Sequence, residues 1–285
     1  MTLQDCYKQT LLKLYSIYNA SEAAIVCNDL LQHVTGKTKL ERLANPTILL
    51  TRNEQDIITQ HIQELLQHKP IQYITGKTYL AGYEFIVSPD VLIPRPETDE
   101  LIAWIQEQHQ QHLSTLLDVG CGSGVIGISL AKKLPNTQVT CTDISEAALT
   151  IAKLNAVKLH TQNIQFLEAD FLQWPNTELA SKTWHVMVSN PPYIGKKESA
   201  DMQPNVLNYE PALALFVPDD DVLIFYKTLA AYAQNHLLPG GYLYVEINEQ
   251  YAQQTAETFA QYGLQEIIIR NDLQGKPRMI RAVKP

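Results

Sequence analysis

The sequence predicts an α/β protein in which a small helical bundle precedes a mostly parallel seven-stranded sheet. Beyond residue 114, short β-rich segments alternate with longer segments of helical periodicity, a pattern typical of a parallel sheet with crossover helices. Before residue 70, apolar residues instead recur three and four positions apart, as in helices that bury one face. The chain has 285 residues, of which 45% are apolar, so it can supply a core for both parts.

Residues 1–70 are expected to form four helices. Ser21 is the expected N-cap of the second helix and Gly36 its end, and Asn53 is the expected cap of a fourth helix that ends at Pro70. The bundle contains no catalytic constellation, so we expect its residues to serve packing and the module as a whole to be a partner-recognition surface. The apolar residues expected on its helices are Leu3, Tyr7, Leu11, Leu14, Tyr15, Tyr18, Ile25, Val26, Leu30, Leu31, Val34, Leu40, Leu43, Ile58, Ile62, Leu65 and Leu66.

Residues 71–93 are expected to form a β-hairpin linker, because β-rich residues alternate on both sides of Gly82. The third part, 94–285, opens with a rigid proline-containing segment that runs into a helix near 97–112. Strands are predicted at 114–119, 137–142, 163–168, 184–189, 242–247, 264–270 and 277–283, and helices near 124–133, 145–158, 220–236 and 249–262. The last two strands are joined without a helix, which predicts that the final strand is antiparallel.

The first strand of the sheet leads into Gly120-Cys121-Gly122-Ser123-Gly124. Glycines at such a turn let the backbone approach a ligand closely and leave free N–H groups at the start of the next helix. A dinucleotide fingerprint would require a further glycine at position 125, where Val125 stands. This excludes the pattern of a nicotinamide-linked dehydrogenase.

Acidic residues follow the next two strands. Asp143 is suited to accept hydrogen bonds from both ribose hydroxyls of a nucleoside. Asp170 could accept from an adenine amino group, and the ring of Phe171 could stack on the base. Each residue alone would be an ordinary turn or cap residue, but together they predict a nucleoside site without a pyrophosphate pattern, which points to S-adenosyl-L-methionine.

The fourth strand ends at Ser189 and is followed by Asn190-Pro191-Pro192-Tyr193. Two prolines cannot donate to a sheet ladder, and Asn190 before a proline is held in an extended conformation. The segment is therefore a stiff platform at the sheet edge where open α/β proteins bind ligands. It presents an amide side chain, two carbonyl groups and an aromatic ring.

Together with Asp118-Val119 before the glycines, these motifs resemble the class I S-adenosylmethionine-dependent methyltransferases, which implies a Rossmann-like domain. The Asn-Pro-Pro-Tyr element implies methylation of an amino group conjugated to a π-system, as in adenine N6, cytosine N4 or a glutamine amide. Residues 70–76, 91–98 and 209–211, and the layout of helical domain, hairpin linker and C-terminal domain, resemble the peptide chain release factor N5-glutamine methyltransferases of the PrmC (HemK) type. Cys121 departs from the threonine or other small residue common in that family, although only its main chain should matter.

This resemblance implies an enzyme that methylates the glutamine of the Gly-Gly-Gln motif of class 1 release factors and yields S-adenosyl-L-homocysteine. Asn190 and Pro191 would each accept a hydrogen bond from the substrate NH2, and Asn190 would also lie against the cofactor. Tyr193, with Pro192, would sandwich the flat amide. Arg95, Glu97 and Glu210 are further candidates for shaping the entrance, although an ion pair that ties the linker to the domain explains them equally well.

The bulk composition limits the alternatives. The formal net charge of −8 disfavours a protein that lives on duplex DNA, although a DNA or RNA amino-methyltransferase and a non-catalytic translation-factor-binding module stay open. The histidines and the four cysteines show no metal-ligand spacing, so no metal is expected and the thiols should be reduced and mostly buried. The sequence shows neither a signal peptide nor a membrane-spanning run. We therefore expect a cytoplasmic monomer that binds no nucleic acid.

Overall fold

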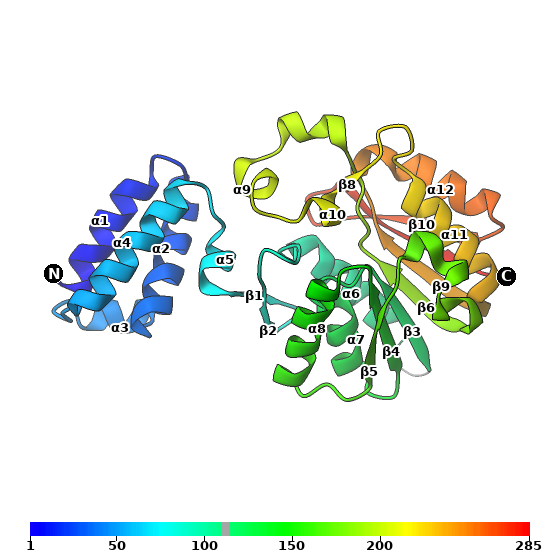
Figure 1. Ribbon diagram of the computed structural model, residues 1–285, viewed down its shortest axis with the longest axis horizontal. Helices are drawn as coiled ribbons and strands as arrows, with labels where there is room; N and C mark the ends of the chain where they lie inside the picture. The colour runs from blue at the N-terminus through cyan, green and yellow to red at the C-terminus, as the bar shows by residue number, and fades with distance from the viewer. Residues whose placement is uncertain (110–113) are drawn as a thin grey trace. The chain divides into compact units, whose positions relative to one another are not determined.

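The computed structural model describes residues 1–109 and 114–285 and separates them into two units (Figure 1). The first unit comprises Met1–Lys77 together with Gln203–Tyr209, and the second comprises Thr78–Met202 together with Glu210–Pro285. The end of the helix expected at 97–112 falls partly outside the described residues.

The first unit consists of helices, as expected. They are α1 (Leu3–Leu14), α2 (Ala20–Thr35), α3 (Lys39–Ala44), α4 (Arg52–Leu66), α5 (Ile71–Thr75) and α9 (Pro204–Leu207). Two caps differ from the prediction. Asn19, not Ser21, caps α2 by accepting from the Ser21 and Glu22 N–H groups, and Thr51, not Asn53, forms a capping box with Glu54 on α4. In both helices the residue two positions earlier offers the better geometry, because its oxygen reaches the free N–H groups of the first turn.

The core of the first unit contains Leu3, Leu14, Val26, Cys27, Leu30, Leu31, Ile58 and Leu65. The expected packing of α3 is wrong, because Leu40 and Leu43 are 77% and 54% exposed. The buried residue of that helix is Arg42. Its guanidinium donates to Gln4 Oε1 at 2.6 Å and to Asn28 Oδ1 at 2.8 Å and lies over the Tyr7 ring. Hydrogen bonds and the ring satisfy the buried charge, which periodicity alone does not reveal.

The linker contains the expected hairpin, formed by β1 (Lys77–Leu80) and β2 (Tyr83–Ile86), but α5 occupies its first residues. The fully buried Asn155 fixes the end of β2. Its Oδ1 accepts from Ile86 N–H at 2.6 Å, and its Nδ2 donates to Ile86 O and to Ser123 O. One amide therefore ties the hairpin to the glycine turn.

The second unit is built on a seven-stranded sheet of order β10-β11-β9-β6-β3-β4-β5. The strands are β3 (Thr115–Val119), β4 (Gln138–Asp143), β5 (Ile164–Glu168), β6 (Trp184–Ser189), β9 (Leu237–Glu246), β10 (Gln265–Asn271) and β11 (Pro277–Val283). Strand β11 runs antiparallel to both its neighbours and the other pairings within this sheet are parallel, so the predicted mostly parallel sheet with an antiparallel last strand is confirmed. Strand β9 begins five residues before the predicted start, at Leu237.

Helices cover both faces of the sheet (Figure 1). Helices α6 (Pro96–Gln108), α7 (Val125–Lys133) and α8 (Glu146–Lys158) pack on one face, and α11 (Ile224–His236) and α12 (Ala252–Gln261) pack on the other. Successive residues of a strand serve opposite faces, as Leu116 and Leu117 do. The short elements are η1 (Phe171–Asn176), η2 (Glu178–Ser181), β7 (Ile194–Gly195), η3 (Lys196–Asp201), α10 (Ala212–Leu215), β8 (Phe216–Val217) and η4 (Glu249–Tyr251).

Among the described helices, none is both long enough and apolar enough to cross a membrane. All four cysteines are unpaired and buried, as the composition suggested.

Candidate active site

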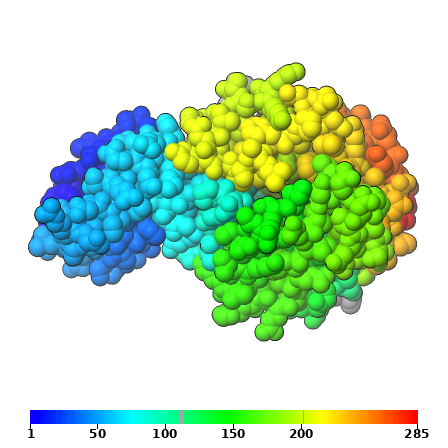
Figure 2. Space-filling model, viewed as in Figure 1, coloured from blue at the N-terminus to red at the C-terminus, as the bar shows by residue number. Residues whose placement is uncertain are grey.

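A pocket in the second unit lies at the carboxyl ends of the parallel strands β3, β4, β5 and β6. In Figure 2 the yellow surface beyond residue 210 borders the green surface of the middle of the chain, and the pocket is lined from both segments. Sequence-predicted residues that line it are Gly120, Cys121, Gly122, Ser123, Asp143, Asp170, Phe171, Asn190, Pro191 and Pro192. Four separate strand ends are thus brought together, as the parallel topology requires. Gly124 and Tyr193 are not among the lining residues.

The turn after β3 depends on its glycines. Gly120, Gly122 and Gly124 have φ of 68°, 53° and 79°, a backbone region that other residues rarely adopt. Gly120 N–H and Cys121 N–H both donate to Thr142 O, which binds the turn to β4. Gly124 does not line the pocket but is the N-cap residue of α7, so it shapes the turn instead.

Asp143 clamps this turn from the end of β4. Its Oδ2 accepts from Gly122 N–H at 2.8 Å and its Oδ1 from Ser145 N–H at 3.0 Å, while burial raises the pKa of the carboxyl above its ordinary value. Each carboxylate oxygen has a second lone pair, so the side chain retains acceptor capacity toward the pocket. The next residue, Ile144, is 46% exposed and lines the pocket with an apolar side chain.

A second carboxyl, Asp118, lies beneath the turn and is fully buried. Its Oδ2 accepts from Gly127 N–H at 2.8 Å and from the Cys141 thiol. Its Oδ1 has no partner among the described residues, and burial raises its pKa to about 7.

Asp170 and Phe171 follow β5. Asp170 Oδ1 accepts from Leu172 N–H at 2.9 Å and so caps the short helix η1. Phe171 is 5% exposed and packs edge-on against Tyr232 in the core, although the residue also lines the pocket. The cap leaves Asp170 Oδ2 as the acceptor that could face a ligand.

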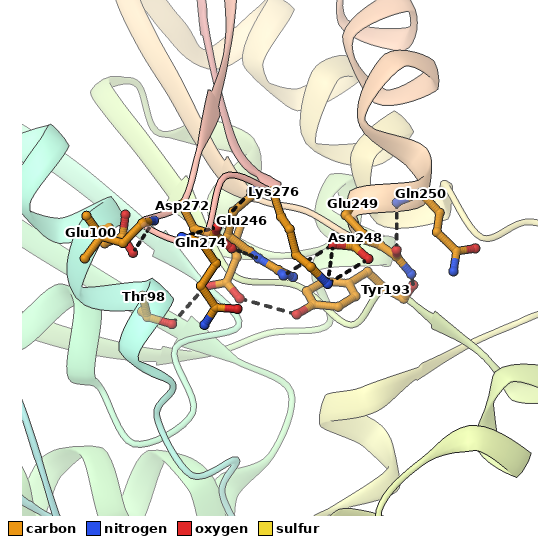
Figure 3. A network of polar contacts seen from close by, with 12 residues as sticks. Thr98, Glu100, Tyr193, Glu246, Asn248, Glu249, Gln250, Asp272, Gln274 and Lys276 are labelled. Carbon is orange, nitrogen blue, oxygen red and sulfur yellow. Dashed lines mark hydrogen bonds and ion pairs between the residues drawn. The ribbon is translucent and has the colours of Figure 1, made fainter.

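Asn190 directly follows β6, whose last residue Ser189 donates from Oγ to Val119 O at 2.8 Å. The Asn190 Nδ2 atom lies 3.5 Å from Thr98 Oγ1. Tyr193 is not among the residues that line the pocket, and its hydroxyl donates to Glu246 Oε1 at 3.3 Å (Figure 3).

The sequence prediction missed part of the pocket wall. The missed lining residues include Val91, Leu92, Pro94, Thr98, Ile144, Leu172, Pro211, Leu213 and Ala214. Of these, Ile144 could have been predicted from the sequence, because it directly follows the acidic strand end Asp143. Leu213 has no such sequence signal. Arg95 and Glu210, considered for the entrance, form an ion pair at 2.5 Å in which Glu210 is buried and also accepts from Ile93 N–H. The ion-pair explanation of these two residues is therefore confirmed.

The chemistry of the pocket fits a nucleoside cofactor. It combines glycine main chain, two carboxylates with remaining acceptor capacity, and exposed apolar side chains against which a base can lie. No group of three His, Cys, Asp or Glu suited to a metal ion occurs in the ranges 1–109 and 114–285.

The chain is similar to known proteins over nearly its whole length. Residues 97–209 match the model of the methyltransferase small domain, and residues 11–76 match that of the PrmC N-terminal domain. The chain is 38% identical over 281 residues to a release factor glutamine methyltransferase of Bacteroides thetaiotaomicron, covering 99% of this chain and 96% of that protein. It is 43% identical over 222 residues to one of Flavobacterium psychrophilum, covering 76% of each chain.

Among solved structures, the catalytic domain of hMettl16, determined with the MAT2A 3'UTR hairpin 6, aligns with a TM-score of 0.55 at 14% identity. The alignment covers 78% of this chain and 91% of that chain. At this identity the likeness concerns the fold alone, which is the methyltransferase fold expected from the motifs.

Proposed function

The chain belongs to the family of release factor glutamine methyltransferases, and we propose that it transfers a methyl group from S-adenosyl-L-methionine to the side-chain amide N5 of the glutamine in the Gly-Gly-Gln motif of class 1 release factors. The observation that carries the proposal is a relationship that extends over nearly the whole of both chains, helical part included.

S-adenosyl-L-methionine supplies an electrophilic methyl group on a sulfonium. In this chain residues 120–123 of the glycine turn would lie against its amino-acid and ribose portion, and Asp143 would accept from the ribose hydroxyls. Asp170 Oδ2 would accept from the adenine amino group. Ile144, with its exposed apolar side chain, and Phe171 would contact the base.

The substrate amide nitrogen is a weak nucleophile because its lone pair is delocalised into the carbonyl. Asn190 Oδ1 and the Pro191 carbonyl would each accept one hydrogen bond from this NH2, which holds the nitrogen in line with the methyl group and raises its electron density as the bond forms. No side-chain base is required, because the methylated amide nitrogen releases its extra proton to solvent. Catalysis would then rest on positioning and on two fixed acceptors.

The proposed role of Tyr193 changes with its position. Because its hydroxyl bonds to the buried Glu246, we propose that it anchors the loop that follows Asn190, with Pro192 as the residue beside the flat amide.

The first unit is proposed to recognise the release factor, and the second to hold the cofactor and the reacting glutamine. Exposed apolar side chains of the first unit, among them Leu12, Leu40 and Leu49, are available for a protein partner. Because a translation factor is the proposed substrate, we further propose a cytoplasmic location. We propose in addition that the chain acts as a monomer. The formal net charge of −8 disfavours methylation of DNA or RNA. The complete pocket disfavours a binding module without turnover.

A methyl-transfer assay tests the proposal. The full chain is incubated with methyl-labelled S-adenosyl-L-methionine and a purified class 1 release factor, and in parallel with a release factor whose motif glutamine is replaced by alanine. Label should enter only the unaltered factor. Label in DNA or RNA but not in the release factor, or equal label in both factors, would overturn it.

A further inference from the structure

The side chain of Asn190 can present either its oxygen or its nitrogen to the pocket, and only the oxygen can accept from a substrate NH2. What lies at the other end of the amide decides between them. That neighbour is Thr98 on α6, whose Oγ1 lies 3.5 Å from Asn190 Nδ2. Thr98 is 2% exposed and lines the pocket together with Asn190.

The Thr98 hydroxyl has one proton, and its direction is set by Glu246. Thr98 Oγ1 donates this proton to Glu246 Oε2 at 2.8 Å. The Thr98 oxygen is then left as an acceptor for Asn190 Nδ2. Because Asn190 presents its Nδ2 to the Thr98 oxygen, its Oδ1 points away from Thr98.

Glu246 is placed to hold both ends of the Asn-Pro-Pro-Tyr segment. It is the last residue of β9, next to β6, and is 2% exposed. Its Oε2 accepts a hydrogen bond from the Thr98 hydroxyl and its Oε1 accepts one from the Tyr193 hydroxyl. The two hydroxyls approach the carboxyl group from either side in Figure 3. Its main-chain oxygen accepts from the Tyr226 hydroxyl at 3.1 Å, which fixes the backbone from α11.

Burying a carboxyl away from water costs folding free energy unless hydrogen bonds or an opposite charge compensate for it. The charged groups that face it are Arg278 on β11, which attracts it, and Glu97 on α6, which repels it. Arg278 is itself ion-paired with Asp272 at 3.3 Å, and the Glu246 oxygens form their hydrogen bonds with Thr98 and Tyr193. Both hydrogen bonds of the Glu246 carboxyl connect it to the Asn-Pro-Pro-Tyr segment. The bond with Tyr193 does so directly, and the bond with Thr98 does so through the contact between Thr98 and Asn190.

We propose that Glu246 and Thr98 are positioning residues that fix the amide orientation of Asn190, so that Oδ1 is aimed at the substrate nitrogen. Glu246 orients the Thr98 hydroxyl, the hydroxyl orients the Asn190 amide, and Tyr193 holds the far end of the segment on the same carboxylate. This assignment rests on the proposed function of Asn190 as an acceptor.

The test compares single and double variants in the methyl-transfer assay with a class 1 release factor. Thr98→Val keeps the shape and removes the hydroxyl, and is expected to lower kcat roughly 10- to 100-fold while the Kd for S-adenosyl-L-methionine changes less than about threefold. Thr98→Ser restores the hydroxyl and should recover kcat. Thr258→Val is the matched control, because Thr258 is a similarly buried threonine whose hydroxyl donates to Gln254 O within α12, away from the pocket lining.

The decisive measurement is the double variant Thr98→Val with Asn190→Ala. If Thr98 acts through Asn190, adding Thr98→Val to Asn190→Ala should leave kcat unchanged within about twofold. A second full loss in the double variant, or an unchanged kcat in both Thr98→Val and Glu246→Gln, would overturn the positioning role while the wild-type assay still supports the function. Absence of methyl transfer by the wild-type chain would instead overturn the proposed function itself.

Discussion

Replacing Gly127 with alanine measures how tightly α7 packs on the sheet below the glycine turn Gly120–Gly124. Gly127 lies in the first turn of α7, and its N–H donates to Asp118. A Cβ added at this position would lie 3.0 Å from Asp118 Oδ2 and closer still to Cys141 Sγ. Both neighbours are 0% exposed, so neither can move into solvent to make room.

The expected cost follows from these contacts. Overpacking a buried site costs about 1–3 kcal/mol, and the short approach to Cys141 favours the upper part of that range. The better helix propensity of alanine returns about 1 kcal/mol, and a weakened Gly127–Asp118 hydrogen bond removes a similar amount. The net loss of unfolding free energy is therefore about 2–3 kcal/mol, which lowers the Tm of a domain of this size by roughly 4–12 °C.

Tryptophan fluorescence is a suitable assay, because all three tryptophans, Trp104, Trp174 and Trp184, lie in the second unit and so report on its unfolding alone. Adding Cys141→Ala removes the clashing sulfur, so the double variant should be more stable than Gly127→Ala. Gly240→Ala is the control: its φ of 74° makes alanine strained there, but the added Cβ meets nothing within 4 Å, so its effect should add independently to that of Cys141→Ala. A Tm of Gly127→Ala equal to wild type, or no gain in the double variant, would refute the packing argument.

Three further predictions concern the site and its buried carboxyls. Asn190→Ala should lower kcat about 10²–10³-fold with little change in the Kd for S-adenosyl-L-methionine, and lost cofactor binding with normal residual kcat would contradict the acceptor role. Asp143→Ala should raise that Kd about 10- to 100-fold in a calorimetric titration, and an unchanged Kd would remove Asp143 from the cofactor site. Burial raises the pKa values of Asp118 and Glu246 to about 7, so the stability that each contributes is full below its unfolded pKa and is lost as the pH rises through about 7. As the pH falls from about 8 to about 6, the unfolding free energy of the wild type should rise by roughly 1 kcal/mol relative to that of Asp118→Asn or Glu246→Gln, as measured by urea unfolding. Parallel pH profiles of wild type and variant would contradict this.

Much of the fold follows from local patterns. The seven strands and the antiparallel last strand were predictable, because β-rich segments in the second unit are short, buried and bounded by glycine, proline or acidic residues. The errors are local too. Asn19 and Thr51 displaced the predicted caps, and Arg42 rather than the neighbouring leucines faces the core of the first unit. Periodicity could not identify Arg42, because its burial depends on partners on other helices.

The site was predictable where a motif follows a strand end. Asp143, Asp170 and Asn190 each follow or end a strand, and the topology brings these strand ends to one pocket. Tyr193 has the same sequence signal as Asn190, yet its hydroxyl bonds to Glu246 and its ring does not line the pocket. The direction in which a loop side chain points depends on a partner elsewhere in the chain.

The sequence by itself therefore determined the individual strands, the glycine turn and the amide platform, because each is encoded within a few neighbouring residues. The tertiary structure alone decided which groups meet behind that platform. Thr98 and Glu246 are 148 residues apart, and Arg95 and Glu210 are 115 apart. Neither pair has a local signature, since a buried carboxyl becomes recognisable only when packing removes water from it and leaves particular hydroxyl or guanidinium donors within reach.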